Sequence, residues 1–197
     1  MTKRNIGRPR SARSQKAIID ATNALLKEKG GTGLTIEAIA KRAGVGKPTI
    51  YRWWPSLADL VLEVLLGQAD AEIAVPPFRS LRETLGRFLR QSMKVIADGA
   101  GVHLRFLMAH AQQNDAFRER FRENFTARRR AVLKSIFLEA ARRGEIGSER
   151  DLDLLVDMVF GAMWFRLLVG HHAMDESFAD ELTEVIITLG TPASPSP

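Results

Sequence analysis

The sequence of 197 residues contains no cysteine and only one tyrosine. Without cysteine, the chain can form neither disulfide bonds nor thiolate metal sites, which is typical of proteins in a reducing compartment. Its longest apolar run, Val159 to Phe165, is far shorter than the roughly 20 residues of a membrane helix. The basic N-terminal segment is not followed by the apolar stretch of a signal peptide. We therefore expect a soluble cytoplasmic protein with no membrane partner.

Sequence signatures of catalysis and of metal binding are also missing. There is no nucleophile elbow, no HExxH motif and no dinucleotide fingerprint. The glycine-rich residues 30–33 lack a P-loop lysine and a preceding strand, so they indicate a helix end and a turn. His103 and His110 are spaced more widely than a usual helical metal pair, and no third ligand stands at a fixed spacing. We expect no catalytic residue, metal or cofactor, although an active site built from scattered residues stays open.

Positive charge is concentrated in the first third of the chain. Residues 1–60 hold 12 Lys or Arg and 4 Asp or Glu, whereas residues 61–197 hold 17 and 19. The net charge of +6 therefore comes entirely from the N-terminal segment. Such an asymmetry predicts a polyanionic partner for that segment.

Apolar residues recur at helical spacing along nearly the whole chain, and no alternating run is long enough for a strand. The predicted fold class is therefore all-α. The predicted helices cover residues 14–29, 35–43, 46–54, 56–71, 81–96, 103–112, 116–143, 151–169 and 178–189. Asp153 and Asp157 share a helix face and could bind a cation, but carboxylates are favoured at a helix start in any case.

Two of these helices form the best-defined motif in the sequence. Thr35 is suited to cap the first helix, and Gly44 is suited to end it in a left-handed conformation. Pro48 falls in the first turn of the second helix, where an N–H is not needed. Ile50 and Trp54, four residues apart, share its buried side. The pattern is that of a helix-turn-helix.

The outward side of the second helix has the character of a DNA-reading surface. It would present Lys47, Thr49, Tyr51, Arg52 and Trp53, none of which is acidic. A short helix of this kind fits the major groove, with side chains reaching base edges and phosphates. The alternative is an ordinary structural hairpin, which many α-proteins contain.

The N-terminal residues 1–13 are predicted to form a flexible basic arm. The run Gly7-Arg8-Pro9-Arg10 would be extended and cationic, so Arg8 and Arg10 could enter a minor groove. The alternative is a solubilising tail that neutralises phosphates without order.

The C-terminal part holds many large, adaptable side chains, which could line a hollow for an apolar or aromatic ligand. The set comprises Phe88, Met93, Phe106, Met108, Phe125, Phe160, Met163, Trp164 and Phe165. The predicted effector pocket consists of Phe88, Met93, Phe106, His110, Phe125 and Met163. The alternative for each apolar member is a place in the packed core.

The run TIEAIAKRAGVGKPTIYRWWPSLADL, residues 35–60, closely resembles the N-terminal domain of the tetracycline-repressor (TetR) family of bacterial transcriptional regulators. The first helix and basic arm extend the resemblance back to about Gly7. The segments RRGEI (142–146) and WFRLLVG (164–170) resemble the C-terminal region of the family more weakly.

The resemblance implies an all-helical homodimer that binds operator DNA, pairs through the last two helices of each subunit and releases DNA when a small effector binds. The implied DNA-contacting residues are Thr35, Lys47, Pro48, Thr49, Tyr51, Arg52 and Trp53. Lys47, Pro48 and Thr49 would face bases. Tyr51 and Trp53 would contact phosphates, as would the start of the helix at Thr35, and Arg52 could do either.

Two positions depart from the family pattern. Leu57 stands where many members have a phosphate-contacting lysine, so that contact is lost or is supplied by Arg42 or the arm. Pro48 replaces a small residue, which puts the operator sequence in doubt.

The expected organisation has four parts: a flexible basic arm (1–13), a helix-turn-helix domain (14–55), a helical effector-binding and dimerisation region (56–190) and a disordered tail (191–197). A promoter-occluding repressor released by an apolar or aromatic effector is the simplest function. The alternative is an all-helical ligand-binding protein or enzyme whose N-terminal domain no longer binds DNA specifically.

Overall fold

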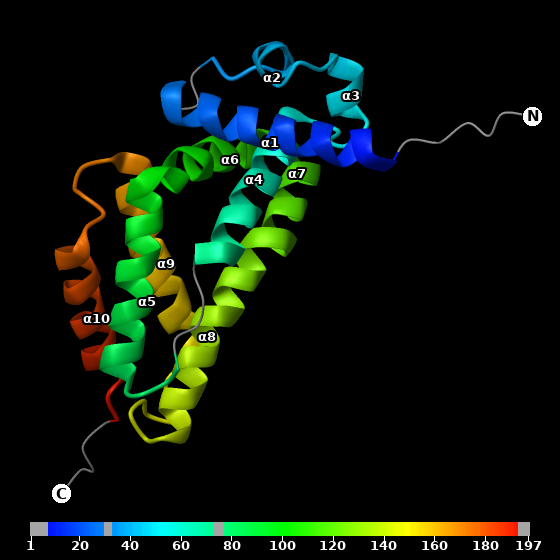
Figure 1. Cartoon of the computed structure of the whole chain (residues 1–197). Helices are drawn as coiled ribbons and strands as arrows, with labels where there is room; N and C mark the ends of the chain where they lie inside the picture. Colours follow the sequence, from blue (N-terminus) through cyan, green and yellow to red (C-terminus); the bar gives the residue numbers. More distant parts are fainter. Residues whose placement is uncertain (1–7, 30–32, 73–76, 193–197) are drawn as a thin grey trace, which may run out of the picture. The chain divides into compact units, whose positions relative to one another are not determined.

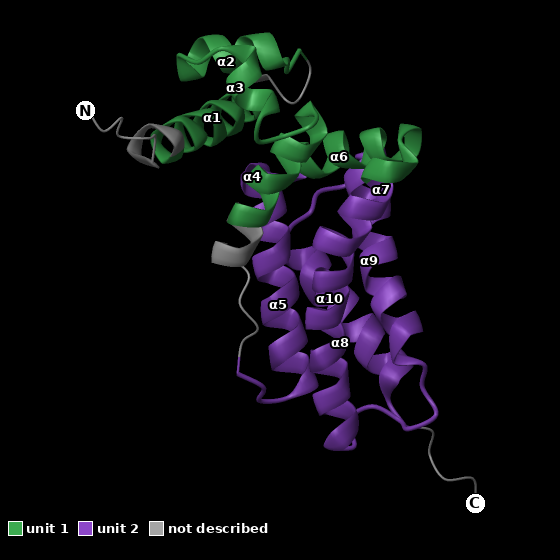
Figure 2. Ribbon diagram, turned by 90° about the vertical axis from the view of Figure 1, so that its right-hand side faces the viewer, with its two compact units in different colours: residues 1–67, 102–117 green, residues 68–101, 118–197 purple. Residues whose placement is uncertain are grey.

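The computed structural model describes residues 8–29, 33–72 and 77–192, and every regular element within these ranges is helical (Figure 1). The predicted all-α fold class is thus confirmed. The described helices include none with both the length and the apolar character of a membrane span. The chain divides into two compact units, residues 1–67 with 102–117 and residues 68–101 with 118–197 (Figure 2).

The elements follow one another in the order predicted from helical spacing. They are α1 (Arg8–Lys29), α2 (Ile36–Ala43), α3 (Lys47–Tyr51), α4 (Leu57–Glu72), α5 (Leu81–Val95), η1 (Ile96–Ala100), α6 (Gly101–Gln113), α7 (Asp115–Phe121), η2 (Arg122–Thr126), α8 (Ala127–Arg142), α9 (Leu152–Val169) and α10 (Glu176–Gly190). η2 is a π-helical segment, whereas η1 contains a kink at Gly99, whose φ is 132°.

The start of α1 differs from the prediction. The helix begins at Arg8 instead of Ser14, so residues 8–13 are helical where an extended, flexible arm was expected. Pro9 is compatible with this because the first turn of a helix does not use that N–H. Residues 1–7 of the arm and residues 193–197 of the predicted tail lie outside the described residues.

The two compact units meet within α4, between Gly67 and Gln68, and again within the segments around residues 101 and 117. The part of α4 up to Gly67 and residues 102–117 group with the helix-turn-helix. Glu63 of α4 provides a physical reason, because its carboxylate accepts hydrogen bonds from Trp54 and Gln15. The helix start predicted after Pro55 is present, since α4 begins at Leu57.

The second unit is built around a bundle of α5, α8, α9 and α10 (Figure 2). α5 packs against α8 and α10, and α9 packs against the same two helices. Its fully buried residues include Leu85, Phe88 and Leu89 of α5, Leu133 and Phe137 of α8, Val156 and Val159 of α9, and Ile186 of α10. Every bundle helix thus buries one apolar face in a common core.

A π-helical segment interrupts the long helix predicted for residues 116–143. η2 (Arg122–Thr126) lies between α7 and α8, so one helical path contains a local widening. Phe121 and Phe125 stay on one side of it, with stacked rings whose centroids are 5.4 Å apart. Such widenings occur often at functional sites because they turn side chains away from regular helical positions.

The first unit is held together by a carboxylate as well as by apolar packing. The side chains of Ile50 and Trp54 are 0% and 3% exposed. Trp54 Nε1 donates to Glu63 Oε2, and Gln15 Nε2 donates to Glu63 Oε1 over 3.3 Å. Glu63 thus connects α1, α4 and the end of the helix-turn-helix.

Replacing Glu63 should destabilise the first unit. In Glu63→Ala, the buried indole N–H of Trp54 loses its acceptor, so we expect the free energy of unfolding to fall by about 1–3 kcal/mol. Asp20→Ala is the control, because Asp20 pairs with Lys16 on an exposed surface, and its loss should cost less than about 1 kcal/mol. Urea denaturation followed by tryptophan fluorescence measures both. Equal stability of the two variants would contradict the assigned role of Glu63.

Candidate nucleic-acid interface and cavity

The turn between α2 and α3 has the geometry that the sequence predicts. The Thr35 hydroxyl caps α2 by accepting a 3.1 Å hydrogen bond from the N–H of Ala38. Gly44 adopts a left-handed conformation with φ 66°, which glycine reaches without a steric penalty. Val45 N–H then bonds back to Ala40 O at 3.0 Å. This turn closes α2 and directs the chain into α3.

The side of α3 opposite the buried Ile50 is exposed. Gly46 precedes the helix in an extended conformation, and Pro48 occupies its first turn as predicted. Lys47, Pro48 and Arg52 are exposed and Thr49 is half-buried. Tyr51 and Trp53 are 52% and 40% exposed. Large aromatic side chains are seldom left in water without a partner, so this surface has the character of an interface.

An acidic residue that was not part of the sequence prediction lies at this surface. Glu37 of α2 forms an ion pair with Lys47 of α3, with both side chains largely exposed. The hydrogen bond between them, reinforced by their opposite charges, lowers the pKa of Glu37 and raises the pKa of Lys47. The outward residues of α3 are indeed free of acids, but α2 supplies one ten residues earlier in the chain.

The remaining predicted contact residues are placed as follows. Thr35 is exposed at the start of α2, and Arg42 near its end pairs with Glu28 at 2.6 Å. The backbone of Arg8 and Arg10 belongs to the first turns of α1, while their side chains lie outside the described part of the structure.

The second unit contains a cavity of about 280 Å³ between α8 and α9, extending onto η2. It is lined by Phe125, Thr126, Arg129, Arg130, Asp157, Phe160, Gly161 and Trp164. Of the six residues predicted for a pocket, Phe125 alone lines this cavity.

The other five predicted pocket residues are elsewhere. Phe88, Met93 and Met163 belong to the bundle core. Phe106 and His110 are half-buried in α6, in the first unit. The His110 ring contacts Phe117 edge-on at 4.9 Å. The helical spacing of the three core residues places them on the buried faces of α5 and α9.

Most of the lining residues were not predicted from the sequence, because they come from two helical segments some thirty residues apart. Phe160 and Trp164 were recognisable as large and adaptable, and their spacing of four places them on one face of α9. Arg129 and Arg130 gave no local signal, since charged residues on helices usually face water, and Asp157 was considered only as a possible cation ligand.

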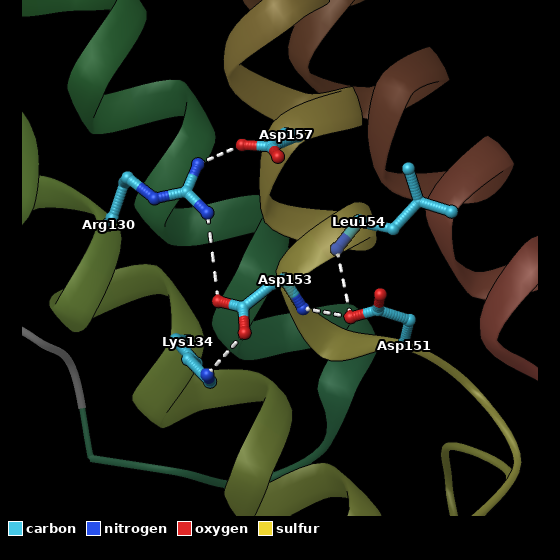
Figure 3. Close-up of polar contacts among 6 residues, drawn as sticks. All are labelled: Arg130, Lys134, Asp151, Asp153, Leu154 and Asp157. Atoms are coloured by element: carbon cyan, nitrogen blue, oxygen red, sulfur yellow. Dashed lines mark hydrogen bonds and ion pairs between the residues drawn. The ribbon is translucent and has the colours of Figure 1, made fainter.

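Asp153 and Asp157 are engaged in ion pairs, as Figure 3 shows. Arg130 pairs with both carboxylates, and Lys134 contacts Asp153 at 2.6 Å. The hydrogen bond from Lys134 lowers the pKa of Asp153. Among the residues that the structure describes, no group of histidines and carboxylates is arranged to hold a metal ion.

Comparison with known proteins places both parts of the chain in one family. Residues 18–64 match the family described as bacterial regulatory proteins, tetR family. Residues 75–186 match the tetracyclin repressor-like, C-terminal domain. The helix-turn-helix-type transcriptional regulator YdeS of Bacillus subtilis (strain 168) is 28% identical over 176 residues, which cover 89% of each chain.

Two further relatives agree with this result. The helix-turn-helix-type transcriptional regulator Rv1556 of Mycobacterium tuberculosis (strain ATCC 25618 / H37Rv) is 30% identical over 171 residues, covering 86% of this chain and 84% of the relative. The crystal structure of the TetR family transcription regulator SCO0332 superimposes with a TM-score of 0.74 at 29% identity, covering 89% and 97% of the two chains. The protein is therefore a member of the TetR family of helix-turn-helix transcriptional regulators.

Proposed function

We propose that this regulator is a cytoplasmic repressor that binds a palindromic operator as a homodimer and leaves it when a small molecule occupies the second unit. The observation that supports operator binding most directly is the exposed side of α3 and of the turn after it, where Lys47, Tyr51 and Trp53 face solvent while Ile50 is fully buried. Because Ile50 is buried, the opposite side of α3 points toward solvent. A helix that enters the major groove requires such a solvent-facing side.

Each exposed residue has a proposed role. Lys47, Pro48 and Thr49 would meet base edges in the major groove, since lysine donates to guanine acceptors and threonine packs against a thymine methyl group. Tyr51 and Trp53 would contact phosphates, and Arg52 either phosphates or bases. The proposed set also includes Thr35 and, toward the minor groove, Arg8 and Arg10.

An exposed apolar stripe on α9 supports dimerisation. Leu154, Met158, Phe165 and Leu168 recur at spacings of four, seven and three, with Phe165 61% exposed. α10 exposes Val185 and Leu189 as well. Apolar residues aligned on two neighbouring helices favour a self-complementary interface around a two-fold axis. We propose that α9 and α10 pair with the same helices of a second subunit.

Release is proposed to follow from a change in the spacing of the two α3 helices. They should lie about 34 Å apart to reach half-sites separated by one DNA turn. A ligand that moves the population from mostly bound to mostly free must favour the released state by about 5 kcal/mol. α4 is the proposed lever, because the chain passes from the first unit to the second within this helix.

The alternative, a ligand-binding protein or enzyme whose first unit no longer reads DNA, makes a different prediction. Fluorescence anisotropy with the protein's own upstream region should show binding that survives excess competitor DNA if the repressor proposal holds. Binding abolished by competitor would favour the alternative.

Lys47→Ala should weaken operator binding by about tenfold or more and change the preferred bases, because a base-contacting cation is lost. Lys94→Ala is the control, since Lys94 is an exposed, ion-paired lysine of the second unit. Anisotropy titrations with the operator and with single-base variants measure both effects. The same loss on operator and on scrambled DNA would rule out base reading by Lys47.

Glu37→Gln should raise DNA affinity about two- to fivefold at low salt, because a carboxylate that competes with phosphate for Lys47 is removed. The gain should shrink as salt concentration rises. Glu83→Gln, which removes an exposed acid from the second unit, is the matched control. Unchanged or lower affinity of Glu37→Gln would show that the ion pair does not oppose DNA binding.

Phe165→Glu should convert the dimer to a monomer, because it places a charge in the centre of the apolar stripe. Leu138→Glu introduces the same charge at an exposed position of α8 and should leave the dimer intact. Sedimentation equilibrium measures the mass of each variant. A dimeric Phe165→Glu protein would place the subunit interface elsewhere.

A further inference from the structure

The cavity in the second unit combines two kinds of wall. Phe125, Phe160 and Trp164 supply aromatic surface, and Arg129 and Arg130 supply guanidinium groups. Its volume of about 280 Å³ is close to the lower end of the range for small-molecule sites. A purely apolar occupant would leave the polar part of the lining unused, so the ligand should carry both an apolar and a charged portion.

Arg129 is positioned by the neighbouring helix α5. Its guanidinium lies 5.2 Å from the centroid of the buried Phe88 ring, and Nη2 is 3.5 Å from Ser92 Oγ. Both partners belong to α5 and are buried. A guanidinium fixed in this way loses little conformational entropy when it binds an anion through paired hydrogen bonds.

Arg130 is positioned by carboxylates of α9, which Figure 3 shows. It forms ion pairs with Asp157 and, at 3.6 Å, with Asp153. Asp157 lines the cavity together with the two arginines. Its carboxylate therefore occupies the position of a counter-anion beside Arg130.

The wall next to these charges is formed by the π-helical segment η2. Phe125 and Thr126 both belong to it and both line the cavity. Phe125 also stacks on Phe121, so the aromatic wall is continuous with packed side chains. The π-helical segment thus contributes the aromatic ring of Phe125 to the wall of the cavity.

We propose that the ligand of this cavity is an amphipathic anion, with an aromatic or apolar body against Phe125, Phe160 and Trp164 and a carboxylate or sulfonate at Arg129 and Arg130. This inference rests on the proposed effector response. It adds an anionic group to the apolar or aromatic effector that the sequence predicts. The ligand anion takes over part of the hydrogen bonding that Asp157 provides to Arg130. Asp157 thus opposes binding and sets the affinity.

The test compares two fluorescent probes that differ by one charged group. 1-Anilinonaphthalene-8-sulfonate carries a sulfonate, and N-phenyl-1-naphthylamine has the same rings without it. The full-length protein should bind the sulfonate at least about tenfold more tightly, the effect of a charge-assisted hydrogen bond. Equal affinities for the two probes would overturn the proposal.

Two matched pairs of variants locate the site. Arg129→Gln should reduce sulfonate affinity by about tenfold or more and leave the uncharged probe nearly unaffected, whereas Arg128→Gln, at an exposed neighbouring position, should change neither. Phe160→Ala should weaken both probes, whereas Leu138→Ala, at an exposed position of α8 outside the lining, should not. Equal effects within either pair would show that the probes bind outside the cavity.

Asp157→Asn provides a gain-of-function test that the uncharged probe controls, because a partly unfolded protein would bind both probes more strongly. Removing the internal counter-anion should strengthen sulfonate binding by about threefold or more and leave the uncharged probe unchanged. Unchanged or weaker sulfonate binding in a folded Asp157→Asn protein would overturn the role of Asp157.

Operator binding by the same preparations separates this inference from the proposed function. Specific operator binding without sulfonate preference would refute the ligand class alone. Sulfonate preference without specific operator binding would refute the repressor proposal alone.

Discussion

The structure of the proposed DNA-reading surface depends on the burial of Ile50 and Trp54. These two side chains fix the rotation of α3, which is too short at five residues to be stable by itself. Trp54 also makes a directional contact, because its indole N–H donates a hydrogen bond to the carboxylate of Glu63. A helix that packed through apolar contacts alone could rotate slightly about its axis. The hydrogen bond restricts that freedom and thereby fixes which side chains face outward.

Local signals in the sequence were sufficient for most of the first unit. Thr35, Gly44 and Pro48 each have a conformational preference that acts over a few residues, so capping, turn and helix start were predictable. The start of α1 was not predicted correctly. Gly7 and Pro9 suggested an extended arm, but a proline is also compatible with a first helical turn, and α1 begins at Arg8. The pair Glu37–Lys47 was also missed, because it depends on how α2 and α3 cross.

The cavity shows the limit of sequence reasoning more clearly. Helical spacing identifies the apolar face of each helix. It does not show where two such faces pack incompletely and leave a cavity between them. Phe88 and Phe125 are equally large, yet one is in the core and the other lines a cavity. Phe125 belongs to the π-helical segment at residues 122–126, and arginines line the cavity beside it, neither of which follows a sequence motif.

α9 carries cavity-lining residues on one side and exposed apolar residues on the adjacent side. Gly161 lines the cavity and also falls between Met158 and Phe165 along the apolar stripe. If a bound molecule alters how this helix meets a second subunit, thermodynamic reciprocity requires that subunit association alter the affinity for the molecule by the same factor. The abundance of the regulator in a cell would then tune its sensitivity, so that scarce and plentiful protein would respond to different concentrations of one signal.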